Sequence, residues 1–375
     1  MTWEQATLKK SLDKYLVTAK TAKDIKGVPY IGGGKGWKAA ENNPDGWWTN
    51  GFWPGIMWLG HAIDGDGFWL SEARRAQDII LPQMHGYYNT SHDLGFMYLL
   101  SVGADYKLTG SMDALRETLL AANLLQGRWN PAGFIRSWNG EGREGWVIVD
   151  CMMNLPLLYS ATKLTGDPRY AMLADLHADF TAREHIRENG SSNHIVIFDP
   201  YTARKLFTPA GQGKFDGSSW SRGQAWALYG FTLAAMHGRH ERFLYTAERV
   251  ARYFISQIDD NGLTRVDFDQ PKDEQYYDNI AGAVAACGLI ELNKLTGKQE
   301  YLDAALKLLH GIDDHTANYG HGTMGILTRC TAAYDASYGK EKECNLIYGD
   351  FFYLEALAKL AGVDPMLWVV DKKKA

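Results

Sequence analysis

The chain has 375 residues, of which 46% are hydrophobic and 22% charged, and its formal net charge is -5 at pH 7. This composition is typical of a folded globular protein with a large core. The negative charge and the lack of a basic patch argue against nucleic acid as a partner. The first residues are polar and no apolar stretch reaches the length of a membrane span, so we expect no secretion signal, no membrane segment and a cytoplasmic location.

Six apolar segments follow one another along the chain, and each is predicted to form a buried helix: 52–62, 94–107, 151–164, 223–236, 280–295 and 350–361. Each ends at a glycine of the kind that closes helices, namely Gly65, Gly110, Gly166, Gly238, Gly297 and Gly362. After five of these glycines comes a more charged, amphipathic helical pattern such as Glu241–Gln257. Apolar helices are buried and amphipathic ones lie outside them.

This sixfold repeat predicts an all-α fold, a single (α/α)6 barrel over residues 1–375. An open helical solenoid is the alternative, but its repeats would be shorter and more uniform. We expect short strands in loops at 194–198 and 262–268, and a loosely ordered tail at 366–375.

Cysteine and histidine spacing gives no sign of a metal or cofactor. Cys151, Cys287, Cys330 and Cys344 are far apart and form no CxxC pair. We expect free, mostly buried thiols rather than disulfides or a zinc site.

Polar residues begin every predicted inner helix. Inner helices of such a barrel run parallel, so these residues converge at one end, where the helix dipoles add positive potential. Arg222 adds a full positive charge there, and we expect a pocket that favours an anionic ligand.

Asp93 and Asp150 each stand at the mouth of an apolar helix. Either carboxylate could simply cap the helix by accepting its free N–H groups. Alternatively, two carboxylates at one pocket indicate glycoside chemistry. A helix N-terminus lowers the pKa of an aspartate whereas a general acid needs it raised, so the acid requires a nearby carboxylate or a desolvated site.

Aromatic residues make up 13% of the chain, with 13 Trp and 20 Tyr. Many lie beside Gly, Asn or Asp, as in 46–53. A large aromatic core is one interpretation, and a cleft in which aromatic faces pack on sugar rings is the other.

Four motifs together resemble the unsaturated glucuronyl hydrolases of glycoside hydrolase family 88: 92–96, 150–158, 220–226 and 348–357. Their order and spacing match, and the resemblance covers nearly the whole chain. It implies an (α/α)6 barrel and no cofactor. The implied substrate is a 4,5-unsaturated uronic acid at the non-reducing end of an oligosaccharide made by a lyase. Hydration of the vinyl ether, with a proton to C4 and water to C5, would release it.

The resemblance implies that Asp150 is the general acid/base and Asp93 its essential partner. It also implies substrate contacts by Trp48, His92, Trp138, His194, Gln212, Trp220, Arg222 and Trp226. Two alternative functions stay open. One is that of the neighbouring glycoside hydrolase family 105, which acts on unsaturated rhamnogalacturonyl oligosaccharides, and the other is sugar binding without catalysis.

Segment 329–346 departs from the family pattern, and Tyr338 or Tyr334 is expected to contact substrate. Ser337 and Lys340 could bind a sulfate or lie in a solvated loop. The downstream sugar stays open, and we expect a monomer or weak dimer.

Overall fold

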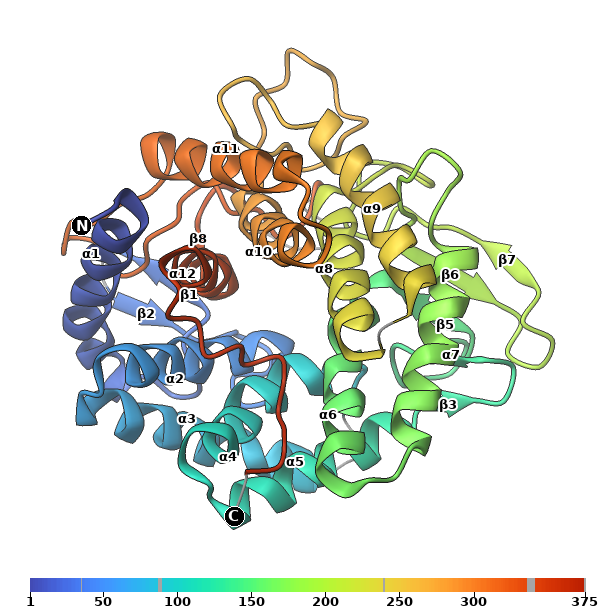
Figure 1. Ribbon diagram of the computed structural model, residues 1–375, viewed down its shortest axis with the longest axis horizontal. Helices are drawn as coiled ribbons and strands as arrows, with labels where there is room; N and C mark the ends of the chain where they lie inside the picture. The colour runs from blue at the N-terminus through green and yellow to red at the C-terminus, as the bar shows by residue number, and fades with distance from the viewer. Residues whose placement is uncertain (35, 87–89, 239, 336–340, 374–375) are drawn as a thin grey trace.

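The computed structural model describes residues 1–373 except 35, 87–89, 239 and 336–340, and its helices form two rings (Figure 1). The inner ring consists of α2 (Phe52–Asp64), the π-helical η3 (Gly95–Gly103) with its continuation α4 (Ala104–Thr109), α6 (Leu155–Thr165), α8 (Ser221–Gly238), α10 (Asn279–Thr296) and α12 (Ile347–Ala361). Each contacts the next, and α12 contacts α2. The ring is therefore closed, which confirms the predicted barrel and excludes the solenoid.

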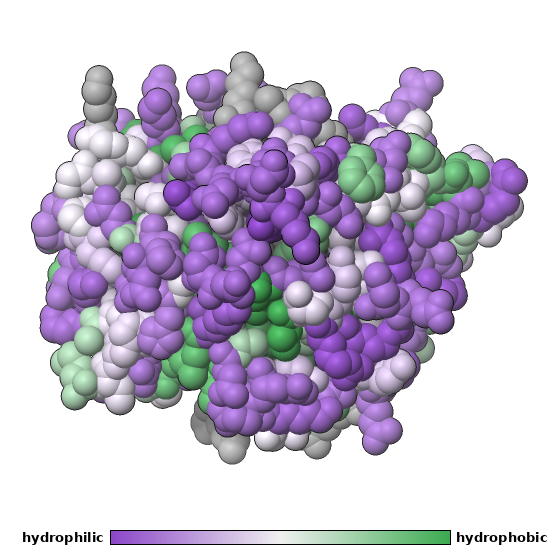
Figure 2. Space-filling view, turned by 90° about the horizontal axis from the view of Figure 1, so that it is seen from above, coloured by the Kyte–Doolittle hydropathy of each residue, from purple (hydrophilic) through white to green (hydrophobic). Residues whose placement is uncertain are grey.

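The outer ring covers the inner one. It consists of α1 (Trp3–Thr18), α3 (Gly67–His85), α5 (Met112–Gln126), α7 (Arg169–Glu184), α9 (Glu241–Ser256) and α11 (Gln299–His315). Five of these helices pack on the inner helix that precedes them, and α1 packs on α12. The first helix of the chain therefore supplies the sixth outer position. The outer surface seen from the side is largely hydrophilic (Figure 2).

Inner and outer helices differ in how much of their surface is buried. Every residue of α8 from Ser221 to Ala235 is buried, whereas α9 buries Phe243 and Phe254 but exposes Tyr245. This is the difference expected between a core helix and an amphipathic one. In the described part of the chain, no helix is both long and apolar enough to cross a membrane.

Five of the six predicted helix-ending glycines have φ between 71° and 83°, a left-handed conformation that glycine adopts readily: Gly65, Gly110, Gly166, Gly297 and Gly362. Gly238 is instead the last residue of α8. The inner helices therefore end close to where the sequence predicts.

Short strands lie in the loops between helices. β2 (Gly36–Lys38), β1 (Ile31–Gly33) and β8 (Asn345–Leu346) form one antiparallel sheet, in that order. β3 (Trp129–Asn130) pairs with β4 (Phe134–Ile135), and β5 (Trp146–Ile148), β6 (Ile195–Phe198) and β7 (Lys205–Phe207) form a third sheet. Three 3₁₀ segments, η1 (Ala19–Asp24), η2 (Trp48–Gly51) and η4 (Val149–Met153), complete the elements.

β6 confirms the strand predicted at 194–198, but the strand predicted at 262–268 is wrong. That segment makes only isolated bridges, from Asp267 to Trp220 and from Arg265 to Tyr277. The side chain of Gln270 accepts the backbone N–H of Asp267, so a local turn replaces a continuous ladder.

The C-terminal segment crosses the end of the ring where the inner helices finish (Figure 1). Leu367, Trp368 and Val370 are buried, and the Trp368 ring stacks on Phe352 at 7° between the planes. The backbone N–H of Val370 donates to Ser160 Oγ on α6 at 3.2 Å. The loose tail expected at 366–375 is therefore wrong for 367–370, because this segment fills the barrel core.

Candidate active site

A cavity of about 480 Å³ opens at the other end of the ring, within the range of small-molecule sites. Its lining comes from segments that precede or begin inner helices and from the loops above them. These residues are Tyr30, Asn43, Gly46, Trp47, Trp48, Ser91, His92, Asp93, Trp138, Arg143, Trp146, Ile148, Asp150, Gln212, Ala332, Glu341 and Tyr348. Both predicted aspartates therefore face the same cavity.

Asp150 lies in η4, directly after β5. The side chain does not cap a helix, because the cap position of η4 is Ile148 and no side chain bonds there. Asp150 is buried, and its Oδ1 has no hydrogen-bond partner among the described residues. Burial raises the pKa of this carboxyl well above its usual value, and the charge of Asp93 raises it further while Arg222 opposes both. Desolvation therefore raises the pKa of Asp150 more than a helix N-terminus would lower it, as a general acid requires.

Asp93 is held by its neighbours in the chain. Its Oδ2 accepts from Ser91 Oγ at 2.7 Å, and Ser91 Oγ in turn accepts the Asp93 backbone N–H at 3.1 Å. Its Oδ1 lies 3.2 Å from His92 Nε2. No side chain caps η3, so the helix-cap interpretation fails for this aspartate as well.

Asn154 connects the two aspartate segments, a role the sequence analysis missed. Its Oδ1 accepts the backbone N–H of Phe96 at 2.8 Å, and its Nδ2 donates to the carbonyl of Asp150 at 3.2 Å. A Cβ on Gly95 would lie 2.6 Å from Asn154 Cα, so the two segments touch through backbone. The available signal was an asparagine inside an apolar run, four residues after Asp150.

His194 approaches Asp150 from the side of β6. Its Nδ1 accepts the backbone N–H of Gln212 at 3.1 Å, so in the neutral imidazole the proton is on Nε2. Nε2 lies 3.6 Å from Asp150 Oδ1, too far for a direct hydrogen bond. Burial is the main cause that lowers the pKa of His194 well below its usual value, and the ring is therefore neutral.

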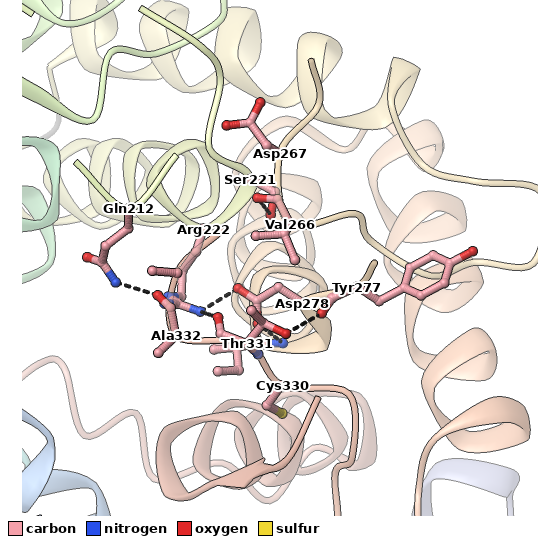
Figure 3. Close-up of polar contacts among 12 residues, drawn as sticks. Gln212, Ser221, Arg222, Val266, Asp267, Tyr277, Asp278, Cys330, Thr331 and Ala332 are labelled. Carbon is pink, nitrogen blue, oxygen red and sulfur yellow. Dashed lines mark hydrogen bonds and ion pairs between the residues drawn. The ribbon is translucent and has the colours of Figure 1, made fainter. Parts of the chain in front are cut away.

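Arg222 does not line the cavity. It is fully buried, forms an ion pair with Asp278, and donates to the carbonyls of Thr331 at 2.8 Å and Ala332 at 2.5 Å (Figure 3). Gln212 Nε2 donates to the same Ala332 carbonyl at 2.5 Å. The expected free positive charge is therefore wrong: Asp278 neutralises it, and the arginine holds the loop at the cavity wall.

The predicted tryptophans fall into two groups. Trp48 and Trp138 line the cavity. Trp220 is buried behind it, with its ring centroid 4.3 Å from that of His194 and 4.5 Å from the Arg222 guanidinium carbon. Trp226 is in the barrel core, where its centroid lies 5.1 Å from Phe96.

The segment expected to contact the downstream sugar is only partly described. Tyr338, Ser337 and Lys340 lie outside the described residues. Tyr334 donates to Glu274 Oε2 at 2.5 Å and is not part of the cavity lining.

Two lining residues close together in the chain, Arg143 in a loop and Trp146 at the start of β5, were also missed. Trp146 and Ile148 alternate along β5 and face the cavity, four and two residues before Asp150 respectively. That alternation was readable from the sequence, but nothing local marked the loop as part of the site.

Comparison with known proteins identifies the family. The family model Glycosyl Hydrolase Family 88 matches residues 35–358. The unsaturated glucuronyl hydrolase of Bacillus sp. (strain GL1) is 34% identical over 371 residues, which cover 96% of each chain. An unsaturated chondroitin disaccharide hydrolase of Streptococcus pneumoniae (strain ATCC BAA-255 / R6) is 33% identical over 83% of this chain and 81% of its own.

Solved structures agree with this match. The crystal structure of the Bacillus sp. GL1 unsaturated glucuronyl hydrolase superposes with a TM-score of 0.91 at 32% identity, over 98% of this chain and 99% of that one. An unsaturated glucuronyl hydrolase specific for heparin superposes with a TM-score of 0.87 at 30% identity, over 96% of this chain and 97% of that one. The chain therefore belongs to Glycosyl Hydrolase Family 88 and is a glycoside hydrolase.

Proposed function

We propose that Asp150 is the proton donor in the removal of a 4,5-unsaturated uronic acid from the non-reducing end of an oligosaccharide. The observation that carries this proposal is a buried carboxyl that faces a sugar-sized cavity with Oδ1 unpaired among the described residues. Its raised pKa keeps it protonated at a higher pH than an ordinary aspartate. Relatives named unsaturated glucuronyl hydrolases support the same substrate class.

The chemistry uses the vinyl ether of the unsaturated ring. Asp150 transfers its proton to C4, and the electron pair of the C4–C5 double bond forms the new C–H bond. The positive charge that develops at C5 and the ring oxygen is stabilised by nearby carboxylates. Water adds at C5 and returns a proton to Asp150. The hemiketal then opens, and the C1 hemiacetal collapses to an aldehyde and the free alcohol of the remaining sugar.

Asp93 is proposed to orient the substrate and to sustain the raised pKa of Asp150. Its fixed carboxylate, held by Ser91, can accept hydrogen bonds from sugar hydroxyls. Trp48, His92, Trp138 and Gln212 line the cavity and are proposed to contact the sugar: the rings pack on its face and the polar atoms bind its hydroxyls or carboxylate.

The remaining predicted residues are proposed to act through others. His194 faces Asp150, Trp220 packs between His194 and Arg222, and Arg222 holds the loop at Ala332. Trp226 packs against Phe96 in the barrel core and so supports the ring of inner helices beneath the cavity. We assign these four residues to positioning.

Loss of the conjugated alkene absorbance measures the reaction directly. Asp150→Asn should lower turnover of an unsaturated disaccharide by about 10²–10⁴-fold, since the amide cannot donate the proton in the same way. Asp260→Asn, at an exposed aspartate, is the matched control and should leave turnover unchanged. Turnover by a folded Asp150→Asn protein within a factor of ten of the unaltered enzyme would overturn the proposal.

A cytoplasmic location and a monomeric or weakly dimeric state are also proposed. The four cysteines are free, as expected of a reducing compartment. The one face that Figure 2 shows is mostly hydrophilic, unlike the face through which an obligate oligomer associates. Cell fractionation and size-exclusion chromatography would test the two points.

A further inference from the structure

Arg143 is the one positively charged side chain among the described residues that line the cavity. The acidic side chains of that lining are Asp93, Asp150 and Glu341. Arg143 is exposed, and within the described chain no carboxylate forms an ion pair with it. Its guanidinium carbon lies 5.8 Å from the ring centroid of Trp146. The cation is therefore positioned against an aromatic face but is not neutralised.

A row of rings leads from the aspartates to this cation. The His92 ring meets Trp138 edge to face at 5.7 Å, and Trp138 meets Trp146 at 6.0 Å. Exposure increases along the row, from the buried His92 through the half-buried tryptophans to the exposed Arg143. The row therefore runs from the reacting end of the cavity to its rim.

The loop that carries Arg143 separates its charges. Glu141 and Glu144 line a neighbouring depression of about 880 Å³, whereas Arg143 lines the active-site cavity. Gly140 and Gly142 have φ of 114° and 75°, which lets the chain reverse direction on either side of Glu141. The loop thus turns its cation inward and its two carboxylates away.

We propose that Arg143, supported by Trp146, binds an anionic substituent on the sugar that follows the unsaturated uronate and so selects acidic substrates. This inference rests on the proposed function, because the unsaturated ring must reach the buried Asp150. The next sugar then extends toward the exposed rim, where the two side chains lie. A sulfate or carboxylate there accepts charge-assisted hydrogen bonds from the guanidinium, and the tryptophan offers a stacking face.

The test compares three unsaturated disaccharides whose second sugar is neutral, sulfated or a uronic acid. Arg143→Gln should lower kcat/KM for the preferred acidic substrate by roughly tenfold or more and leave the neutral one within about twofold. Arg143→Lys should retain part of the preference, because it keeps the charge but not the planar fork. Arg204→Gln, at an exposed arginine, is the matched control.

The three substrates distinguish the possible outcomes. A larger loss with the sulfated than with the uronate substrate identifies sulfate as the ligand, and the reverse identifies a carboxylate. An equal loss with all three would place Arg143 on the unsaturated uronate itself and overturn the inference, as would no loss with any. If the unaltered enzyme turned over none of the three, the proposed function would fail instead.

Discussion

Breaking the buried ion pair between Arg222 and Asp278 should destabilise the protein before it affects substrate binding. Neither side chain is exposed, and the pair joins α8 to the start of α10. Among the described residues, Arg222→Met leaves Asp278 with two backbone N–H donors, from Ile280 and Thr331, each at 3.3 Å. An uncompensated carboxylate in the interior is unfavourable, so the loss of stability exceeds the value of the contact itself.

Removing one partner of a buried pair costs about 3–5 kcal/mol. With 375 residues and about 2.1 cal/mol/K of unfolding entropy per residue, a loss of about 4 kcal/mol lowers Tm by roughly 5 °C. Asp278→Asn should cost a similar amount, since it leaves Arg222 unpaired. The double variant Arg222→Met/Asp278→Asn removes both charges and should recover more than half of the loss.

Thermal and urea unfolding of the three variants, with KM measured in parallel, would check this reasoning. A double variant no more stable than Arg222→Met alone would show that the unpaired charge is not the cause. If Arg222→Met kept its stability but raised KM steeply, direct substrate binding by Arg222 would be the better account.

Three further predictions concern the acid and the closed end of the barrel. Asp93→Asn removes a charge that raises the pKa of Asp150, so the alkaline limb of kcat/KM should move to lower pH; an unmoved limb would contradict this coupling. The folded protein retains a proton on Asp150 that the unfolded chain loses above about pH 4, so this group's stabilising contribution falls as pH rises. Asp150→Asn should therefore be more stable than the unaltered protein in urea at pH 7, and the gain should shrink as the pH falls and vanish below about pH 4. Trp368→Ala should cost about 3–5 kcal/mol in urea unfolding and Trp368→Phe clearly less.

Helix positions could be predicted from the sequence because they depend on local patterning. The apolar runs and their closing glycines recur in α2, α6, α10 and α12 nearly as expected. The surroundings of Arg222 could not be predicted from the sequence, because its partners Asp278 and Thr331 lie 56 and 109 residues away in the chain. The burial of Trp368 likewise depends on a ring that only the complete fold creates.

Four aspartates lie at or near the starts of inner helices. The local sequence does not show which of them hold the fold together and which face a cavity. Asp350 accepts from Tyr15, from Asn345 and from two backbone N–H groups, and Asp278 is paired with Arg222. Those carboxylates hold helices and loops together. Asp150 instead has an oxygen without a hydrogen-bond partner in the described chain, and it faces a cavity.

That difference has an energetic consequence for the site. A buried carboxyl oxygen that lacks a donor destabilises the fold and favours the protonated form. The opposite end of the barrel is closed by Trp368, which donates to Glu355 Oε1 at 2.9 Å. Glu355 Oε1 in turn lies 3.2 Å from Nζ of the buried Lys359, while Glu355 Oε2 has no hydrogen-bond partner in the described chain. Asp150 differs from Glu355 in that it lines the active-site cavity. A donor introduced beside Asp150 Oδ1 would be expected to stabilise the protein while it weakens the proposed acid.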